Sequence, residues 1–335
     1  EARRVAVVLL TGAGDDFSSG LDLSAIDVSR EGEPPFERMM EVVLDTMDEA
    51  AQRRVLQLFS RGRPSRIHDF VAALAERHAL RAIVTTNFDP HLEAALERRL
   101  GGGAWTVSAD AEAFDSIDWE GDAIPVLKLH GSVEDPTRLA VTMRRVAHPG
   151  SVARIRSTVQ RAFTDATSSD VLVLGYSFSD RYDISPALQG CASCPLHVTV
   201  VQHAATAPPT LREDEAAKVG TCLEGFDHVA SIEGRTADVV DAIAVRLELE
   251  LHHAEGNQEA PGSDWRSALT DAIAEIGDRN GNLTRDFLAG SLLMMISAPR
   301  EAIPYLARVV EGASSLKPQQ ALAALQALGA AQMSA

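Results

Sequence analysis

The sequence predicts an α/β fold with a doubly wound, mainly parallel, Rossmann-like sheet, a helical insertion at residues 35–80 and a small all-α C-terminal module. Two observations lead to this prediction. Short, β-rich apolar runs recur through the first 251 residues, and segments with helical spacing of apolar residues separate them. Because these runs are continuously apolar, each strand should be buried on both faces, as in parallel sheets that helices cover on both sides.

Six apolar runs are expected to form strands. They are VAVVLLT from Val5, RAIVTTN from Arg81, PVLKLH from Pro125, DVLVLGYS from Asp170, HVTVVQ from His197 and VASIEG from Val229. A helix after the last run should close the sheet domain near Leu251. The region Pro35–Leu80 contains MMEVVLDTM and IHDFVAALAERHAL, and it is too long for one crossover helix. It should form several helices as a cap or insertion.

The chain after Leu251 changes character. Residues 252–263 are polar, with Gly and Pro, and are predicted to be a linker between a domain at 1–251 and a helical module at 264–335. Four amphipathic segments are expected in this module, namely Asp264–Ile276, Arg285–Ser297, Glu301–Val310 and Pro318–Leu328. Short helices with short turns suggest an antiparallel repeat similar to tetratricopeptide repeats, and so a site for a homo-oligomer or a partner protein.

Composition excludes several classes of protein. A net charge of −17 opposes direct nucleic-acid binding, which needs clustered Lys and Arg, and no apolar run is long enough to span a membrane. Three cysteines argue against a disulfide framework and favour a reducing cytoplasm. Because residue 1 is Glu and not Met, the sequence leaves open whether a targeting segment precedes it.

Cys191 and Cys194 form a CxxC pair, which has two interpretations. The pair could be half of a zinc site, but a tetrahedral structural site needs four ligands and the sequence has no second pair. The simpler interpretation is a turn of small residues before the strand LHVTVVQ. We therefore expect no metal.

Four of the expected strands end in polar, glycine-containing segments: TGAGDDFSSG, TTNFD, HGS and GYSFSD. In doubly wound sheets ligands bind outside the carboxyl ends of the strands, so these segments should meet in one crevice. The amides of Gly12 and Gly14 could face a pyrophosphate, although a simple tight turn is the alternative.

Two side chains in these segments are candidates for chemistry. Asn87 stands at a strand end, two residues before Asp89-Pro90, which should begin a helix with Asp89 as N-cap and Pro90 as the first helical residue. His130 closes the run PVLKLH beside Gly131, where an imidazole can act as a general base. Taken alone, each residue is more often structural than catalytic.

Together these segments resemble the sirtuin family, in the same order along the chain. TGAGDDFSSGL resembles its GAGxSxxSGI loop, TTNFD its TQNxD segment, LHGS its catalytic HG and LGYSFSD its GTS strand end. The resemblance covers residues Val5–Leu251 and implies a domain that takes NAD as substrate, with Asn87 and His130 as catalytic residues. It implies NAD contacts at Gly12, Ala13, Gly14, Ser19, Thr86, Asp89, Gly175, Ser177 and Gln202.

The sequence also departs from the sirtuin deacylase pattern. The paired CxxC zinc ribbon and the segment that binds acyl-lysine are missing, Asp16 replaces a loop serine and Thr86 replaces a glutamine. These losses concern recognition of a protein substrate, so the expected activity is hydrolysis of NAD to nicotinamide and ADP-ribose. The segments also resemble the NAD-hydrolysing effector domains of bacterial antiphage systems. The alternatives are an NAD-dependent protein deacylase and a non-catalytic NAD or ADP-ribose sensor.

Overall fold

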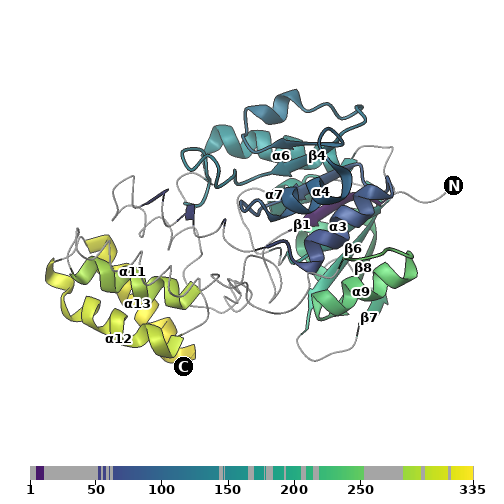
Figure 1. Cartoon of the computed structure of the whole chain (residues 1–335). Coiled ribbons are helices and arrows are strands. Elements are labelled where there is room, and N and C mark those ends of the chain that lie inside the picture. The colour runs from purple at the N-terminus through teal and green to yellow at the C-terminus, as the bar shows by residue number, and fades with distance from the viewer. Residues whose placement is uncertain are drawn as a thin grey trace.

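The computed structural model describes residues 5–10, 52–53, 56–57, 60, 63–142, 146, 148–164, 170–176, 178, 184–191, 194–204, 209–213, 219–252, 282–295, 299–315 and 318–334. It consists of a mixed α/β part around a large sheet and a group of C-terminal helices (Figure 1).

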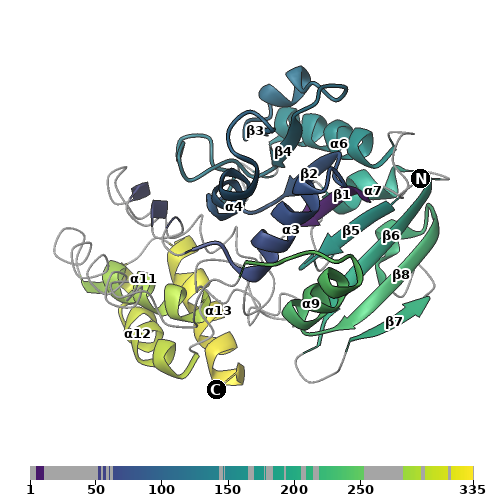
Figure 2. The same cartoon turned by 45° about the vertical axis from the view of Figure 1, so that its right-hand side comes forward.

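Within the described residues, eight strands form one twisted sheet. They are β1 (Val5–Leu10), β2 (Ala82–Thr85), β3 (Trp105–Ser108), β4 (Ile124–Lys128), β5 (Asp170–Leu174), β6 (Cys194–His203), β7 (Thr210–Glu213) and β8 (Phe226–Gly234). Their order is β3-β4-β2-β1-β5-β6-β8-β7, and every neighbouring pair is parallel except β7 with β8. Figure 2 shows β5, β6, β8 and β7 side by side at one end of this sheet. The predicted Rossmann-like architecture is confirmed.

Helices cover both faces of the sheet. They are α3 (Arg66–Glu76), α4 (His91–Leu100), α6 (Pro149–Thr164), α7 (Ile184–Gln189) and α9 (Thr236–Arg246), with short 3₁₀ turns η1 (Ala113–Ser116) and η2 (Thr221–Leu223). Side chains of α3, α4 and α9 share one core cluster, and side chains of α6, α7 and η2 share the other. The helices that follow β1 and β2 (α3 and α4) cover one face, and the helices before and after β5 (α6 and α7) cover the other. Because β2 and β5 lie on opposite sides of β1, the strand order reverses there, and the β1–β5 boundary is the topological switch point.

Neighbouring residues of one strand enter different cores. Ile83 packs with α3 and α4, whereas Val84 packs in the cluster that contains α6. Leu172 and Val173 divide in the same way in β5. Because successive side chains of a strand point to opposite faces, the continuous apolar runs are explained by burial on both sides.

Two edge strands were not predicted. The middle residues of β3 are exposed, and β7 exposes Leu211 by 67%. Neither strand carries the apolar run by which the inner strands were recognised, because an edge strand needs burial on fewer sides. Of the predicted helical insertion at 35–80, the structure describes α3 and short helical pieces at 52–53 and 56–57, and residues 35–51 lie outside the described residues.

The C-terminal helices pack on one another through small and apolar residues. They are α11 (Asn282–Met295), α12 (Pro299–Glu311), the 3₁₀ turn η3 (Ala313–Ser315) and α13 (Pro318–Ser334). A Cβ at Gly290 would lie 2.6 Å from Leu306, so α11 and α12 approach closely there. The predicted segment Asp264–Ile276 lies outside the described residues. The last helix runs six residues beyond the predicted end at Leu328.

One expectation about this module is tested only in part. We expected apolar residues such as Trp265, Leu269, Leu292, Leu293 and Leu306 to exceed what the helices could bury by themselves. Leu306 is buried among residues of α12 and α13, and Leu293 packs against the same cluster, whereas Trp265, Leu269 and the side chain of Leu292 lie outside the described part. Within the described part of the C-terminal helices, the exposed large apolar side chains are on α13 and include Leu322 and Met333.

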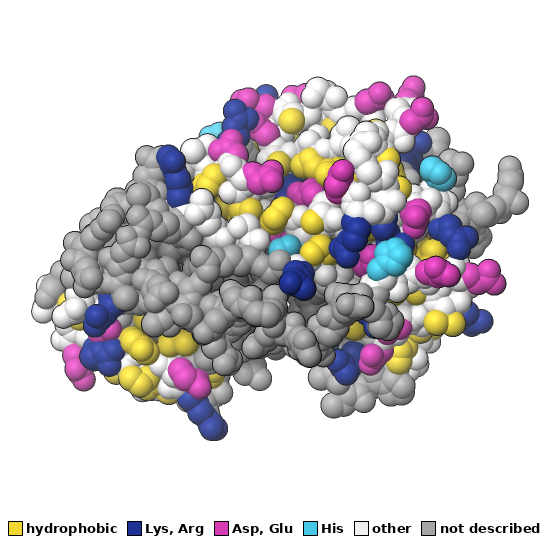
Figure 3. Space-filling view, in the orientation of Figure 1, with side chains coloured by type: hydrophobic (Ala, Val, Ile, Leu, Met, Phe, Trp, Pro, Cys, Tyr) yellow, Lys and Arg dark blue, Asp and Glu magenta, His cyan; other side chains and the backbone are white. Residues whose placement is uncertain are grey.

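Figure 3 shows acidic and basic side chains mixed over the visible face of the sheet domain, and among the described side chains of that face no extended basic patch gathers. None of the described helices is both long and apolar enough to cross a membrane.

Candidate functional site

The carboxyl ends of five strands lie in one row. The registers place Lys128 beside Thr85, Thr85 beside Leu10, Leu10 beside Leu174, and Leu174 beside Val201. The predicted site residues follow this row directly, with Thr86 and Asn87 after β2, His130 after β4, Gly175 after β5, and Gln202 one position beyond Val201. The fold therefore brings segments from distant parts of the chain to one edge of the sheet, across the switch point.

The loops after β2 and β4 are joined by backbone hydrogen bonds. The Leu129 N–H donates to the Thr85 carbonyl at 2.9 Å, and the Val133 N–H donates to the Phe88 carbonyl at 2.9 Å. These bonds lie on both sides of the HGS turn. They set Asn87 and His130 on adjacent segments of the same edge.

Asn87 has a fixed backbone and an unused amide donor. Its N–H donates to Thr85 Oγ1 at 3.0 Å, which ties the residue to the end of β2. Its Nδ2 is buried, and within the described part of the chain no acceptor reaches it. A buried donor without a partner is costly unless something else satisfies it, so this amide is available to a bound ligand.

His130 is held by a turn that only glycine can complete. Its carbonyl accepts the Ala140 N–H at 2.8 Å, and Gly131 follows with φ +88°. A Cβ on Gly131 would lie 3.1 Å from the Arg138 carbonyl oxygen and 3.1 Å from the Leu139 Cα. The positive φ and the close backbone together explain the glycine. His130 itself is partly exposed at the site edge.

The start of α4 differs from the prediction by one residue. The helix begins at His91, and Pro90 is its N-cap. Asp89 is buried, and its Oδ1 accepts the His91 N–H at 3.0 Å in a turn two residues long. Pro90 has no N–H to donate, so the Asp89 carboxylate accepts the N–H of the following residue, His91. Asp89 therefore supports the helix start, although it does not occupy the N-cap position.

A buried lysine at this edge was not predicted. Lys128 ends β4, and its Nζ lies 2.7 Å from the Asp89 carbonyl oxygen and 2.5 Å from Glu93 Oε1. Its side chain is 1% exposed. Burial raises the pKa of Glu93, while the Lys128 ammonium acts against that shift. One charged residue inside the apolar run PVLKLH was a signal in the sequence, but its partners could be found only in the fold.

Two buried histidines lie behind this loop. His68 of α3 and His91 of α4 face each other edge to face, with ring centroids 5.9 Å apart. His68 Nδ1 accepts the Ser65 N–H at 2.9 Å and so completes the capping box of α3. Burial lowers the pKa of His68 from 6.5 to about 4, and the Asp89 carboxylate acts against this shift. His68 is therefore neutral at physiological pH.

Among the described residues of the loop after β5, Gly175 and Phe178 have positive φ, at +68° and +58°. The rings of Tyr176 and Phe178 meet edge to face at 4.8 Å. Ser185 donates to the Phe178 carbonyl at 3.2 Å and lies 3.2 Å from the Tyr176 hydroxyl. These contacts fix the third segment of the edge through aromatic residues that the sequence analysis did not single out.

Part of the predicted site lies outside the described residues. These positions are Gly12, Ala13, Gly14, Ser19 and Ser177. Their predicted contacts with NAD stay predictions. The structure does place the end of β1, from which the glycine loop departs, between β2 and β5.

Two of the three cysteines are described as part of the core. Cys191 and Cys222 are both buried, and Cys191 Sγ lies 3.6 Å from the Ala187 carbonyl oxygen at the end of α7. Cys194 is the first residue of β6. Among the described residues, no group of three His, Cys, Asp or Glu side chains is arranged to hold a metal.

The strand order, the switch point and the polar strand ends are those expected of a sirtuin-like fold. Residues 81–215 match the family of SIR2-like domains. This SIR2-like segment runs from the start of β2 to the end of β7 and includes Asn87, Asp89, His130 and Gly175. No curated protein sequence matches the chain.

Solved structures also resemble the chain. One of them, described as "Structural Basis for the Mechanism and Regulation of Sir2 Enzymes", aligns with 16% sequence identity and a TM-score of 0.37. The alignment covers 74% of this chain and 93% of that chain. The assignment of the SIR2-like segment rests on the family match and on the strand order.

Proposed function

We propose that this protein is an NAD⁺ hydrolase that releases nicotinamide and ADP-ribose. The observation that carries the proposal is the adjacency of Asn87 and His130 at the switch-point edge, with the Asn87 amide buried and lacking a partner in the described part. The family match of residues 81–215 supports NAD as the ligand class.

The chemistry needs a water molecule, a base and a positioned ribose. Nicotinamide leaves as a neutral pyridine that takes the electron pair of the glycosidic bond, so no general acid is required. Asn87 would orient the water or a ribose hydroxyl, which contributes through positioning. His130 would accept the proton that the attacking water loses as its oxygen bonds to the ribose C1′, a contribution of roughly 10² to 10⁴ in rate.

The fixed backbone around both residues supports these roles. Thr85 holds the Asn87 backbone, and the Gly131 turn holds His130, so both sit on elements fixed by the sheet. A site on rigid elements loses less freedom when substrate binds, which is the requirement for positioning catalysis. Asp89 contributes to this rigidity through its bond to the His91 N–H.

The decisive experiment follows nicotinamide release from NAD with and without an acetylated peptide. Release that does not depend on peptide supports the hydrolase. Release only with the peptide would instead identify a deacylase. Binding of NAD or ADP-ribose without any release would identify a sensor. The assay is repeated with a strong chelator. We expect nicotinamide release to continue, because cleavage of the glycosidic bond of NAD⁺ needs no metal ion.

We also propose that the activity serves antiphage defence in the cytoplasm and that the C-terminal helices control it through self-association. Support comes from the resemblance of TTNFD, KLHG and LGYSFSD to antiphage effector domains and from the exposed apolar face of α13. An unregulated NAD hydrolase would deplete the cofactor of its own cell. Phage challenge of bacteria that express the wild type or the Asn87→Ala variant tests the biological role.

A further inference from the structure

We propose that Lys128 is a positioning residue, whose buried ammonium braces the loop that carries Asn87 against the turn that carries His130. The proposal rests on the NAD hydrolase function proposed above, because that function makes Asn87 and His130 the reacting pair. It adds a residue that the sequence motifs did not identify.

Three contacts place Lys128 between the two segments. Its Nζ donates to the Asp89 carbonyl at 2.7 Å and to Glu93 Oε1 at 2.5 Å, and it lies 3.5 Å from Ser132 Oγ. Asp89 comes two residues after Asn87, and Ser132 comes two residues after His130. An ammonium group has three donors, so one side chain can satisfy acceptors on both loops.

A charged side chain such as that of Lys128 is unusual in a buried inner strand. The other residues of β4, such as Val126 and Leu127, are buried and apolar, and an apolar residue at position 128 would fit the same core. Burying a lysine costs solvation free energy that its ion pair does not reliably recover. What Lys128 provides is directional contact with two loops, which an apolar side chain cannot supply.

The Lys128 contacts restrain a part of the two loops that their backbone hydrogen bonds leave unlinked. The bonds from Leu129 to Thr85 and from Val133 to Phe88 join the two segments at their ends. The Lys128 ammonium adds a link to the Asp89 carbonyl, between the Asn87 side chain and the start of α4. A displacement of about 1 Å at reacting groups can cost roughly 10²-fold in rate, so a small relaxation is sufficient to slow turnover.

The first test uses variants that separate bracing from stability. Lys128→Met leaves Glu93 buried without its cation and should destabilise the fold. The double variant Lys128→Met/Glu93→Leu removes both charges and should recover the stability. In the double variant we expect kcat to fall about 100-fold while KM changes less than about threefold, because the lost interaction acts on the reacting geometry. Recovery of kcat together with stability would overturn the proposal.

A second variant keeps the test independent of the folding of the double variant. Glu93→Gln preserves the contacts of Lys128 with Asp89 and Ser132, so its kcat should stay within about threefold of the wild type. A kcat loss in Glu93→Gln as large as that in Lys128→Met would show that the ion pair, and not the brace, matters. The matched control is Arg66→Met/Asp241→Leu, an ion pair between α3 and α9 that is partly exposed and should leave kcat unchanged.

A third readout does not depend on NAD cleavage. Hydrogen exchange of the Val133 amide, which bonds across the two loops, should accelerate at least about tenfold in Lys128→Met/Glu93→Leu, while amides of β5 keep their protection. Unchanged exchange at Val133 would refute the brace. If the wild type cleaves no NAD, the proposed function fails, yet this measurement still decides whether Lys128 braces the loops.

Discussion

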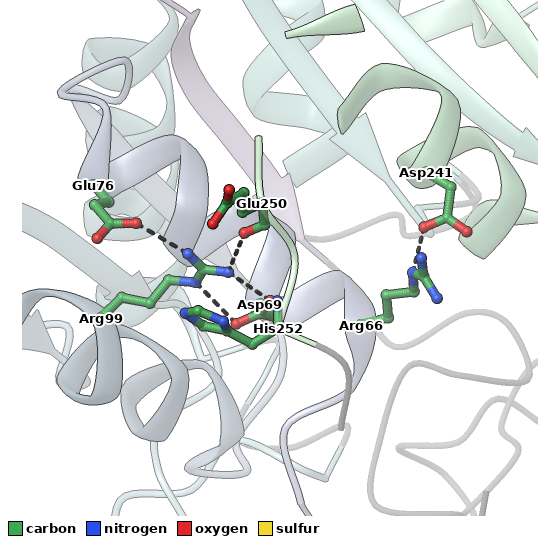
Figure 4. A network of polar contacts seen from close by, with 7 residues as sticks. All are labelled: Arg66, Asp69, Glu76, Arg99, Asp241, Glu250 and His252. Carbon is green, nitrogen blue, oxygen red and sulfur yellow. Dashed lines mark hydrogen bonds and ion pairs between the residues drawn. The ribbon is translucent and has the colours of Figure 1, made fainter. Parts of the chain in front are cut away.

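Arg99 binds Asp69 through two parallel hydrogen bonds between α4 and α3, with 2.9 Å from Nε to Oδ1 and 2.7 Å from Nη2 to Oδ2 (Figure 4). Asp69 Oδ2 also accepts the His252 N–H at 2.7 Å, and Arg99 donates to the Glu250 carbonyl. The pair therefore fastens the chain that leaves α9 to the two helices on the same face of the sheet. Their side chains are 3% and 4% exposed.

The first prediction concerns this pair. Arg99→Ala leaves the Asp69 carboxylate buried without its cation and should lower the free energy of unfolding by about 3–5 kcal/mol. The control is Arg66→Ala, whose ion pair with Asp241 also joins two helices but is more than one-third exposed on both sides. Exposed pairs contribute about 0–1 kcal/mol. Urea unfolding of both variants measures the difference, and equal losses would contradict the burial argument.

The strands of the sheet that are buried on both faces were predictable from the sequence. β2 and β4 are buried along their whole length, so their sequences are continuously apolar and were recognised. β3 and β7 are edge strands with exposed residues such as Leu211, and their short sequences do not differ from loops. Edge strands are specified by pairing with a neighbour, which a local pattern does not contain.

The placement of the candidate residues was predictable where they stand next to strand ends. Asn87 and His130 were singled out because polar residues that follow buried strands meet at one edge in a doubly wound fold, and their catalytic roles stay predictions. Glu93 and His68 were missed, because each owes its importance to a partner from another element. In the sequence both are ordinary helical residues, and only the fold shows that Glu93 contacts Lys128 and that His68 contacts His91.

The second prediction tests the catalytic pair. Asn87→Ala should abolish nicotinamide release, and His130→Ala should slow it by roughly 10² to 10⁴, because each removes a group proposed to act on the attacking water. Neither side chain belongs to the two main core clusters, so the melting temperature should change little. The assay is nicotinamide release by folded variants. Near wild-type turnover in folded Asn87→Ala would remove that residue from the mechanism, and loss of folding in both would favour structural roles.

The third prediction concerns pH and stability. The pKa of His68 is about 4 in the native protein and 6.5 ordinarily, so the unfolded chain binds more protons between these values. Its contribution to stability is therefore complete above pH 6.5 and is lost as the pH falls toward 4. About 2.5 pKa units at about 1.36 kcal/mol each give roughly 3 kcal/mol. Burial raises the pKa of Glu93, so the folded state binds a proton at this carboxylate more readily than the unfolded state does. The contribution of Glu93 to stability therefore increases as the pH falls, opposite to that of His68.

A matched variant isolates the histidine. His68→Gln removes the titration but keeps a side-chain acceptor at the third helical position, where glutamine commonly completes a capping box. The unfolding free energy of the wild type should fall between pH 7 and pH 4 by roughly 3 kcal/mol more than that of His68→Gln. Denaturant unfolding at several pH values measures this. Parallel pH profiles would mean that His68 is not the titrating group.

The last prediction concerns α13 and the control of activity. Leu322, Leu325 and Met333 are exposed by 50%, 51% and 74%, and with Gly329 they recur at spacings of three and four residues along one helix face. A Cβ at Gly329 would meet nothing within 4 Å, so another backbone can approach there. The helix carries no charged residue in a chain of net charge −17. Two copies can therefore meet through this face without the repulsion expected elsewhere.

We expect Leu322→Glu/Leu325→Glu to shift the full chain toward monomer and to change NAD turnover at a given protein concentration, because added carboxylates would repel across a self-interface. The control is Val245→Glu on α9, which places the same charge at a side chain that is 78% exposed. Light scattering and nicotinamide release, measured across protein concentration, read mass and activity together. A shift from 1:99 to 99:1 between inactive and active forms needs about 5.5 kcal/mol of differential binding, so an interface that controls activity must be sensitive to these substitutions. The same mass and specific activity for wild type and both variants at every concentration would show that α13 takes no part in assembly or control.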